Sequence, residues 1–277
     1  MKLSSTQFDA IQKAANEIRV DCLRMGSVTG PGGAHFGSAL SMVEIMAVLY
    51  TEVMKFDSNS PLSPSRDRFI LSKGHGSMSY YAALKLSGFV TDEDLMTFKS
   101  NNTFLYGHPS MDPEHGIEFS TGSLGLGLGL GVGTAIGLRL KKNLESKVIV
   151  LMGDGECNEG SVWESAASAS HFKLSNLVAI VDQNGLQYDG STSEILDMGE
   201  LESKWESFGW EAKVVDGHDI EELWGALMEI SDKPKAIIAK TVKGKGISFM
   251  ENNPAWHHSR ISQVDLDRAM LELKAPK

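Results

Sequence analysis

Cysteines and long hydrophobic runs are scarce in this sequence, and each shortage argues against a class of protein. The chain has 277 residues but only two cysteines, Cys22 and Cys157. So few thiols argue against a disulfide-rich secreted protein and fit a reducing compartment. No apolar run reaches the roughly 18 residues of a membrane-spanning helix, and the opening MKLSSTQFDA lacks the apolar segment of a signal peptide. We therefore expect a cytoplasmic protein with no membrane partner.

Positive charge is also in short supply. Lys and Arg total 26 against 36 Asp and Glu, which gives a formal net charge of −10. This balance disfavours general binding to nucleic acid, so we expect no such partner. A strict G-x-G-x-x-G pattern is absent too, even from the glycine-rich residues 122–137 (GSLGLGLGLGVGTAIG), which argues against a dinucleotide-binding fingerprint. Those glycines instead predict a turn that leads into a helix packed closely against a neighbour.

A strand–helix–strand unit is predicted in the middle of the chain. Residues 147–152 and 176–181 are short apolar runs rich in β-branched residues, which is typical of parallel strands buried on both faces. Ser161 and Glu164 have the spacing of a capping box at the start of the intervening helix. The apolar stripe of that helix consists of Val162, Ala166, Ala169 and Phe172. A strand–helix–strand unit places both strand ends at the same edge of the sheet.

Polar residues follow both of these strands. Gly153-Asp154-Gly155 comes after the first strand, and Asp182-Gln183-Asn184 comes after the second. Each segment alone is an ordinary turn, since Asp, Asn and Gly are common turn formers. Together, however, they supply oxygen ligands at adjacent strand ends, which a hard cation such as Mg²⁺ or Ca²⁺ prefers. The flanking glycines and the helix start would admit a diphosphate, so the pairing favours a binding site.

The sequence around these turns resembles that of one enzyme family. GDGECNEGSVWESA and AIVDQNGLQYDG are similar to the thiamine-diphosphate and divalent-metal motif of transketolases, and the resemblance covers roughly residues 8–261. It implies a three-layer α/β fold with a mostly parallel sheet and helices on both faces. It also implies one domain over residues 1–277, with an active-site loop and a helix in residues 241–277. The ligands implied for Mg²⁺ (or Ca²⁺ or Mn²⁺) are Asp154, Asn184 and the carbonyl of Leu186. The implied contacts to thiamine diphosphate are His75, Gly122, Leu124, Gly153, Asp154, Gly155, Glu159 and Asn184.

Four histidines fall on active-site positions of the family. The matching segments are AHFGSALSM, DRFILSKGH, GHPSMDPEHGIEFSTGSLG and the Trp-His-His at residues 256–258. The resemblance therefore implies catalytic roles for His35, His75, His108 and His257. His258 stands where the family has glycine, so the sequence leaves open whether His257 or His258 is the active-site residue. Leu126 replaces a glutamine found in most members.

The resemblance implies a glycolaldehyde transferase of pentose phosphate and carbohydrate metabolism. A two-carbon ketol unit would pass from a ketose phosphate to an aldose phosphate. Full transketolases continue into a pyrimidine-binding domain and a C-terminal domain, whereas this sequence ends at Lys277. We therefore expect the N-terminal subunit of a split transketolase, with a separate C-terminal subunit, self-association and a heterotetramer. Glu159 matches a glutamate that the family places at its subunit contact.

Three alternatives stay open at this point. The same metal motif would serve another thiamine-diphosphate enzyme, such as a deoxyxylulose-phosphate synthase or a 2-oxoacid dehydrogenase. The departures at Leu126 and His258 allow a transketolase for an unusual branched sugar, for example apulose phosphate. A non-catalytic assembly subunit could also retain the fold.

Overall fold

A parallel sheet forms the centre of the molecule. The computed structural model describes residues 2–143 and 145–274. Within these residues the sheet has five strands, all parallel, in the order β1-β2-β3-β5-β4. The strands are β1 (Arg68–Leu71), β2 (Val148–Gly153), β3 (Leu177–Gln183), β4 (Glu211–Asp216) and β5 (Lys235–Lys240). The predicted strand–helix–strand unit is confirmed as β2, α7 and β3, with Met152 and Val181 in register.

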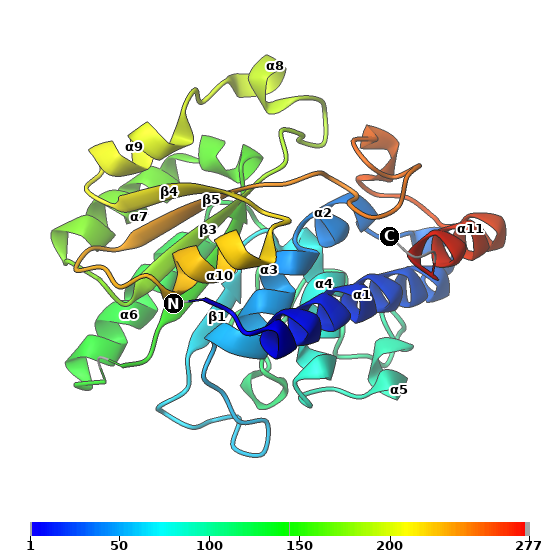
Figure 1. Cartoon of the computed structure of the whole chain (residues 1–277), viewed down its shortest axis with the longest axis horizontal. Coiled ribbons are helices and arrows are strands. Elements are labelled where there is room, and N and C mark those ends of the chain that lie inside the picture. Colours follow the sequence, from blue (N-terminus) through cyan, green and yellow to red (C-terminus); the bar gives the residue numbers. More distant parts are fainter. Residues whose placement is uncertain (1, 144, 275–277) are drawn as a thin grey trace.

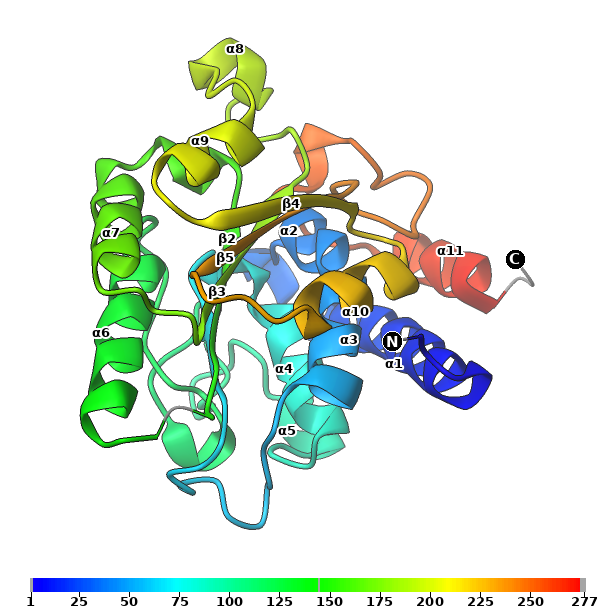
Figure 2. The ribbon, with the colours of Figure 1, turned by 60° about the vertical axis from the view of Figure 1, so that its left-hand side comes forward.

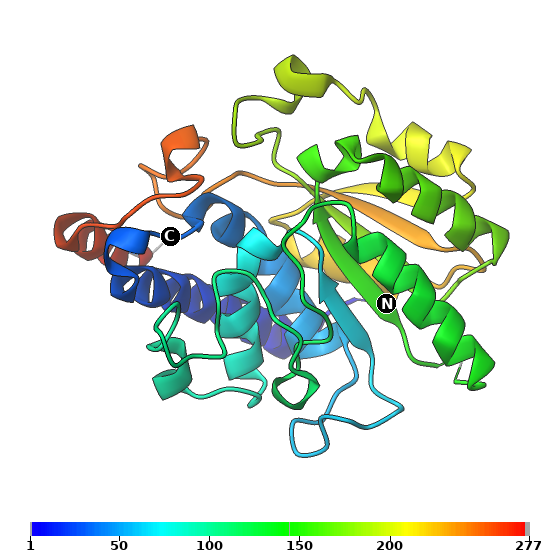
Figure 3. The same cartoon turned by 180° about the vertical axis from the view of Figure 1, so that it is seen from behind.

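Helices cover both faces of this sheet, so the expected three-layer α/β fold is confirmed (Figures 1 and 2). On one face lie α6 (Gly127–Leu140), α7 (Gly160–His171) and α9 (Leu201–Ser207); Figure 3 shows α6 and α7 side by side in green. On the other lie α1 (Ser5–Val28), α2 (Phe36–Ser41), α3 (Val43–Val48), α4 (Ser77–Leu86) and α10 (Ile220–Met228). The remaining helices are α5 (Asp92–Leu95), α8 (Thr192–Leu196), which projects from the body, and α11 (Gln263–Lys274) beside α1. None of the helices in the described ranges is long and apolar enough to traverse a lipid bilayer.

Two hydrophobic cores follow from the alternation of side chains along the strands. Ile149 and Leu151 of β2 pack in the core beneath α1, α3 and α4, whereas Val148 and Val150 pack in the core beneath α6 and α7. Because both faces of the central strands are buried, residues 148–152 of β2 and 177–181 of β3 are apolar without interruption, as is typical of parallel sheets. Three indoles gather in the second core, where Trp205 contacts both Trp163 and Trp210, with ring centroids 5.3 and 4.8 Å apart.

Local details of the helices differ from the predictions. The predicted capping box of Ser161 and Glu164 is wrong, because α7 begins at Gly160 with Glu159 as its N-cap residue, two positions before Ser161. The Ser161 hydroxyl instead donates to the Gly125 carbonyl at 2.9 Å. Phe172 was expected in the buried stripe but lies at the C-cap with 46% of its surface exposed. α3 is followed directly by a π-helical turn, Leu49–Val53.

The glycines of α6 make the close approach that the sequence predicts, but the neighbour is the sheet of the same chain. A methyl group at Gly127 would overlap Ser72 at the end of β1. A methyl at Gly131 would meet the Val150 side chain at 2.5 Å. These two positions therefore bring the start of α6 onto β1 and β2, which fixes the turn that precedes it.

A buried ionic group joins three helices. Glu44 on α3 pairs with Arg19 of α1, and its other oxygen lies 2.9 Å from Nδ1 of His218, just before α10. Nε2 of His218 accepts a hydrogen bond from the Val242 amide at 2.8 Å. Burial alone would raise the pKa of Glu44, but the hydrogen bond from His218 and the charge of Arg19 lower it to about 2.

This depressed pKa predicts acid-sensitive folding. The unfolded carboxylate binds a proton near its ordinary pKa, so the stabilisation is complete above that value and is lost as the pH falls towards 2. We expect the free energy of unfolding to fall more steeply below about pH 4.5 in the native chain than in Glu44→Gln, by on the order of 3 kcal/mol in total. Urea unfolding at several pH values measures both slopes, with the exposed Glu93→Gln as control. Parallel slopes for the native chain and Glu44→Gln would contradict the assignment.

Candidate active site

A cavity of about 220 Å³ opens at the carboxyl ends of the central strands. Parallel α/β sheets commonly bind ligands at this edge. The cavity brings together nearly all of the predicted site residues: His35, His75, His108, Gly122, Leu124, Gly153, Asp154, Gly155, Asn184, Leu186 and His257. Glu159 is the exception, since it is the exposed N-cap residue of α7 and does not line the cavity.

The predicted metal ligands lie on two adjacent turns. Asp154 follows β2 and accepts hydrogen bonds from the amides of Gly155 and Gly185, at 2.9 and 2.7 Å. Asn184 follows β3, and its Oδ1 accepts from the Leu186 amide at 3.1 Å. The carboxylate of Asp154 therefore bridges the two turns and holds their oxygens at one edge of the cavity.

A divalent cation fits this set of oxygens. Burial and the nearby Asp182 raise the pKa of Asp154 to about 6, so the site disfavours the uncompensated carboxylate charge. The ammonium of Lys243 already donates to the Leu186 carbonyl at 2.9 Å, which shows that this oxygen attracts positive charge. Carboxylate, amide and carbonyl oxygens are also the ligand types that Mg²⁺ and Ca²⁺ prefer.

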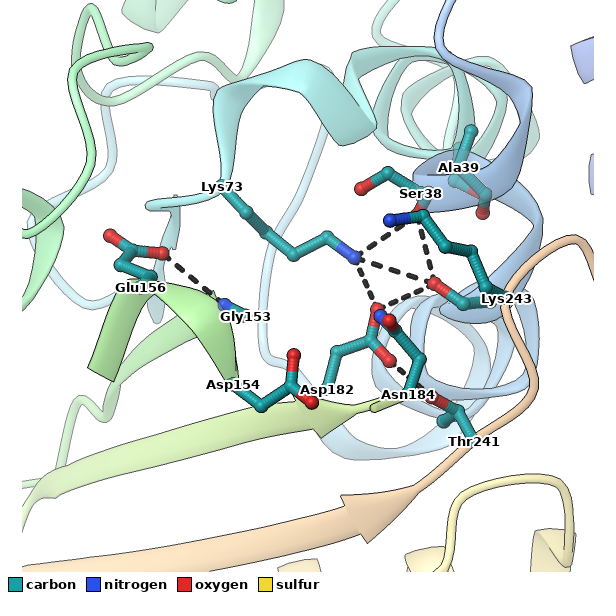
Figure 4. A network of polar contacts seen from close by, with 12 residues as sticks. Ser38, Ala39, Lys73, Gly153, Asp154, Glu156, Asp182, Asn184, Thr241 and Lys243 are labelled. Atoms are coloured by element: carbon teal, nitrogen blue, oxygen red, sulfur yellow. Dashed lines mark hydrogen bonds and ion pairs between the residues drawn. The ribbon is translucent and has the colours of Figure 1, made fainter. Parts of the chain in front are cut away.

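A buried ion pair supports the floor of the cavity (Figure 4). Lys73, which follows β1, points at the carboxylate of Asp182 on β3 and forms a salt bridge with it. Asp182 also accepts hydrogen bonds from the hydroxyls of Ser41, at 2.5 Å, and Thr241. Both charged side chains are almost fully buried, so each depends on the other for compensation.

Five imidazoles meet at the mouth of the cavity. The ring centroid of His35 lies 5.6 Å from those of His75, His108 and His257. It lies 4.5 Å from that of His258, which is exposed and does not line the cavity. The loop that carries His257 is anchored by Trp256, whose indole packs edge-on against Phe36 and Phe249.

Burial and mutual repulsion keep these histidines uncharged. Burial is the main cause of the lowered pKa at each of them, and the neighbouring imidazoles and lysines add to it. The pKa falls to about 3 for His35 and to about 4 for His257. Neutral imidazoles present one donor and one acceptor nitrogen each, which suits binding to hydroxyl groups and proton transfer.

Unused donors inside the cavity also point to a polar ligand. In the described part of the chain, three buried atoms that face it have no hydrogen-bond partner: Oγ of Ser38, Nε2 of Gln187 and Nδ1 of His257. Buried polar groups are normally paired, so such atoms indicate a missing partner. Hydroxyl and amide donors beside Lys243 match the oxygens of a diphosphate.

Several cavity residues could not be identified from the sequence alone. Ser38, Lys73, Glu156, Gln187 and Lys243 all line the cavity, and Asp182 lies beneath it. Lys73 and Asp182 could have been found from their position, since both are charged residues at the carboxyl ends of strands. Lys243 and Gln187 reach the cavity from long loops, and nothing in the spacing of residues places them there.

Comparison with known proteins gives the family of this fold and cavity. The family model described as "Transketolase, thiamine diphosphate binding domain" matches residues 10–273. The chain belongs to the transketolase family. Its thiamine-diphosphate-binding fold is therefore confirmed, as is the interpretation of the chain as the N-terminal part of a transketolase, an enzyme of the transferase class.

Similar transketolases are both short and long. One of the subunits of the apulose-4-phosphate transketolase of Actinobacillus succinogenes is 40% identical over 269 residues, which cover 96% of this chain and 97% of that protein. The 6-deoxy-6-sulfo-D-fructose transketolase subunit SqwG of a Clostridium species is 38% identical, with 98% of each chain covered. Human transketolase is 39% identical over 98% of this chain, which spans only 43% of the human protein. The crystal structure of Campylobacter jejuni transketolase superposes with a TM-score of 0.87 at 31% identity, over 96% of this chain and 43% of that one.

Proposed function

We propose that this transketolase chain is the diphosphate-binding subunit of a two-subunit enzyme that transfers a ketol unit. It would move a two-carbon ketol group from a ketose phosphate to an aldose phosphate, with thiamine diphosphate and Mg²⁺ bound in the cavity. The observation that carries the proposal is the meeting of Asp154 and Asn184, at adjacent strand ends, with four uncharged histidines in one cavity.

Residues of this chain would hold the metal and the diphosphate. Asp154, Asn184 and the Leu186 carbonyl would bind Mg²⁺, or Ca²⁺ or Mn²⁺ in its place. Lys243 and Ser38 would donate to diphosphate oxygens, and the turns at Gly122 to Leu124 and at residues 153–155 would admit the diphosphate close to the backbone. When bound, thiamine diphosphate supplies the carbanion stabilisation that this chemistry requires.

The histidines would orient the sugar and move protons. The rings of His75, His108 and His257 surround that of His35 at 5.6 Å, and His75 stacks on His257 at 5.4 Å, so a bound sugar hydroxyl would meet several of them at once. As neutral imidazoles they would take a proton from a hydroxyl at one nitrogen and hold or return it as the carbon–carbon bond breaks and forms.

A separate C-terminal subunit would complete the active site. This chain matches whole proteins that are themselves called subunits, and it spans less than half of single-chain transketolases. We place Glu159 at a contact between subunits, because it is exposed at the start of α7 outside the cavity. Two copies of each subunit would form a heterotetramer in the cytoplasm, where the two buried free thiols, Cys22 and Cys157, stay reduced.

A reconstitution assay tests this function. The purified chain should transfer no ketol group from xylulose phosphate to ribose phosphate by itself. Adding the C-terminal subunit, thiamine diphosphate and Mg²⁺ should restore the transfer. Full activity of the single chain would refute the two-subunit proposal. Metal-dependent thiamine diphosphate binding without any ketol transfer would favour another thiamine-diphosphate enzyme, and no binding would favour an assembly role.

The sugar itself is a second question. Apulose 4-phosphate is a candidate donor, because a relative whose name includes it is 40% identical over nearly the whole chain. The departures at Leu126 and His258 are close to cavity residues: Leu126 follows Leu124 by two positions and is 56% exposed, and the ring of His258 lies 4.5 Å from that of His35. A donor panel of xylulose, fructose and apulose phosphates separates the cases. Turnover of the unbranched sugars alone would exclude the branched one.

Substituting each of the two adjacent histidines tests which of them acts in the active site. His257 lines the cavity and packs against Tyr188, whereas His258 is exposed. We expect His257→Asn to lower kcat by about 100-fold and His258→Asn to lower it by less than about threefold. Steady-state kinetics of the two-subunit enzyme measures both values. The reverse order would place His258 in the active site instead.

A further inference from the structure

Glu156 is a buried carboxylate at the meeting point of three loops. It lies two residues after Asp154, and only 2% of its surface is exposed. Its Oε2 accepts a hydrogen bond from the Gly153 amide at 3.2 Å, and its Oε1 accepts from the Gly125 amide at 2.8 Å. Oε1 also accepts a hydrogen bond from the hydroxyl of Ser72. These three donors belong to the turn after β2, the turn before α6 and the end of β1. Figure 4 shows the contact with Gly153.

Ser72 extends this set of contacts to the start of α6. Its hydroxyl oxygen accepts a hydrogen bond from the Gly127 amide at 3.0 Å while its proton points to Glu156. The glycine-rich turn also packs closely against the loop after β1, since a methyl group at Gly74 would lie 3.0 Å from the Gly122 amide nitrogen. The carboxylate and the serine together therefore tie residues 122–127 to the ends of β1 and β2.

The chemistry of these contacts calls for a carboxylate. All three of its partners are donors, and each oxygen is used, so the group acts only as an acceptor. Among the described residues, no cation lies within salt-bridge distance of Glu156. A buried carboxylate costs free energy unless hydrogen bonds satisfy its oxygens, and here two backbone amides and one hydroxyl do so. Glutamine would have the same shape but would turn an NH₂ group towards a donor.

We propose that Glu156 is a positioning residue that holds the turn at residues 122–127 against the turn at residues 153–155. The two turns would thereby form a rigid cradle for the diphosphate of thiamine diphosphate, and this last step rests on the proposed function. Gly122 and Leu124 on one side, and Gly153 to Gly155 on the other, line the same cavity. Glu156 acts through these backbone segments and is not itself a ligand of the metal.

Amide hydrogen exchange tests the positioning without any cofactor. In Glu156→Gln we expect the amides of Gly125 and Gly127 to exchange about tenfold faster, because a neutral amide oxygen is a weaker acceptor for Gly125 and for the Ser72 hydroxyl that supports Gly127. Exchange in β3 and α10 should stay unchanged. The matched control is Glu164→Gln, an exposed glutamate two turns along the same segment. Should Glu156→Gln fail to fold, Ser72→Ala removes the bridging hydroxyl and should accelerate exchange at Gly127.

Calorimetry with thiamine diphosphate and Mg²⁺, on the assembled two-subunit protein, adds the second readout. We expect Glu156→Gln to weaken binding by about tenfold, as loss of a supporting hydrogen bond commonly does. Unchanged exchange at residues 122–127, or faster exchange spread evenly over the sheet, would overturn the positioning role. Faster exchange with unchanged affinity would overturn the link to the diphosphate. Faster exchange in a protein that binds no thiamine diphosphate would uphold the positioning and refute the proposed function.

Discussion

Asp154→Asn is expected to weaken the binding of thiamine diphosphate by more than about 100-fold, since loss of even an outer-shell partner costs 10- to 100-fold. The substitution keeps the size of the side chain but removes its negative charge from the set of oxygens that would hold the metal. The diphosphate would then lose the cation that links it to the protein. Calorimetry of the assembled protein, with Mg²⁺ present and absent, measures the effect.

The control for this variant is Asp232→Asn, which makes the same chemical change at an exposed position between α10 and β5. Its affinity should equal that of the native chain. Thermal unfolding of Asp154→Asn should remain cooperative, because its amide oxygen still reaches one of the two backbone donors. Native affinity in Asp154→Asn at limiting Mg²⁺ would refute the metal site.

Asp182→Asn is expected to destabilise the fold by about 3–5 kcal/mol, the usual cost of removing one member of a buried ion pair. The ammonium of Lys73 would be left with uncharged partners alone, among them the Ser38 carbonyl, at 3.1 Å, and the Ser41 hydroxyl, at 3.4 Å. Because its surface exposure is 1%, water cannot replace the lost charge. Urea unfolding of the single chain measures the change.

A double substitution distinguishes the contribution of the two charges to stability from the contribution of packing. Lys73→Met alone would leave Asp182 buried with the Ser41 and Thr241 hydroxyls as its side-chain partners. Lys73→Met combined with Asp182→Asn removes both charges and should recover much of the lost stability. If the two single effects simply added, the charges would not be coupled, and the contact would contribute only through its shape.

Much of the fold was predictable because its signals are local. Residues 148–152 of β2 and 177–181 of β3 are apolar at every position, and the glycines at Gly127 and Gly131 indicate a close approach. Ser161 illustrates the limit of such signals. Its spacing to Glu164 fits a capping box, but a carbonyl from a distant loop, that of Gly125, takes its hydroxyl instead. Tertiary partners of this kind leave no trace in local spacing.

The candidate site likewise contains residues that local spacing predicts and residues that it does not. Asp154 and Asn184 stand out because they directly follow strands, and strand ends of a parallel sheet converge. Lys243 belongs to the cavity only because its loop folds back onto the strand ends. The contacts of Glu156 with Ser72 and Gly125 likewise join segments that are far apart in the sequence. The choice between His257 and His258 likewise needed the orientation of the loop, which places one ring inside and the other outside.

The tryptophans lie in two separate places, so their fluorescence would report two different events. Trp163 on α7, Trp205 on α9 and Trp210 just after α9 are packed together, so their emission would follow unfolding of this core. Trp256 instead sits on the loop that carries His257, beside the cavity mouth. A chain that keeps Trp256 as its sole indole would therefore report ligand arrival by a change in fluorescence, with no added label.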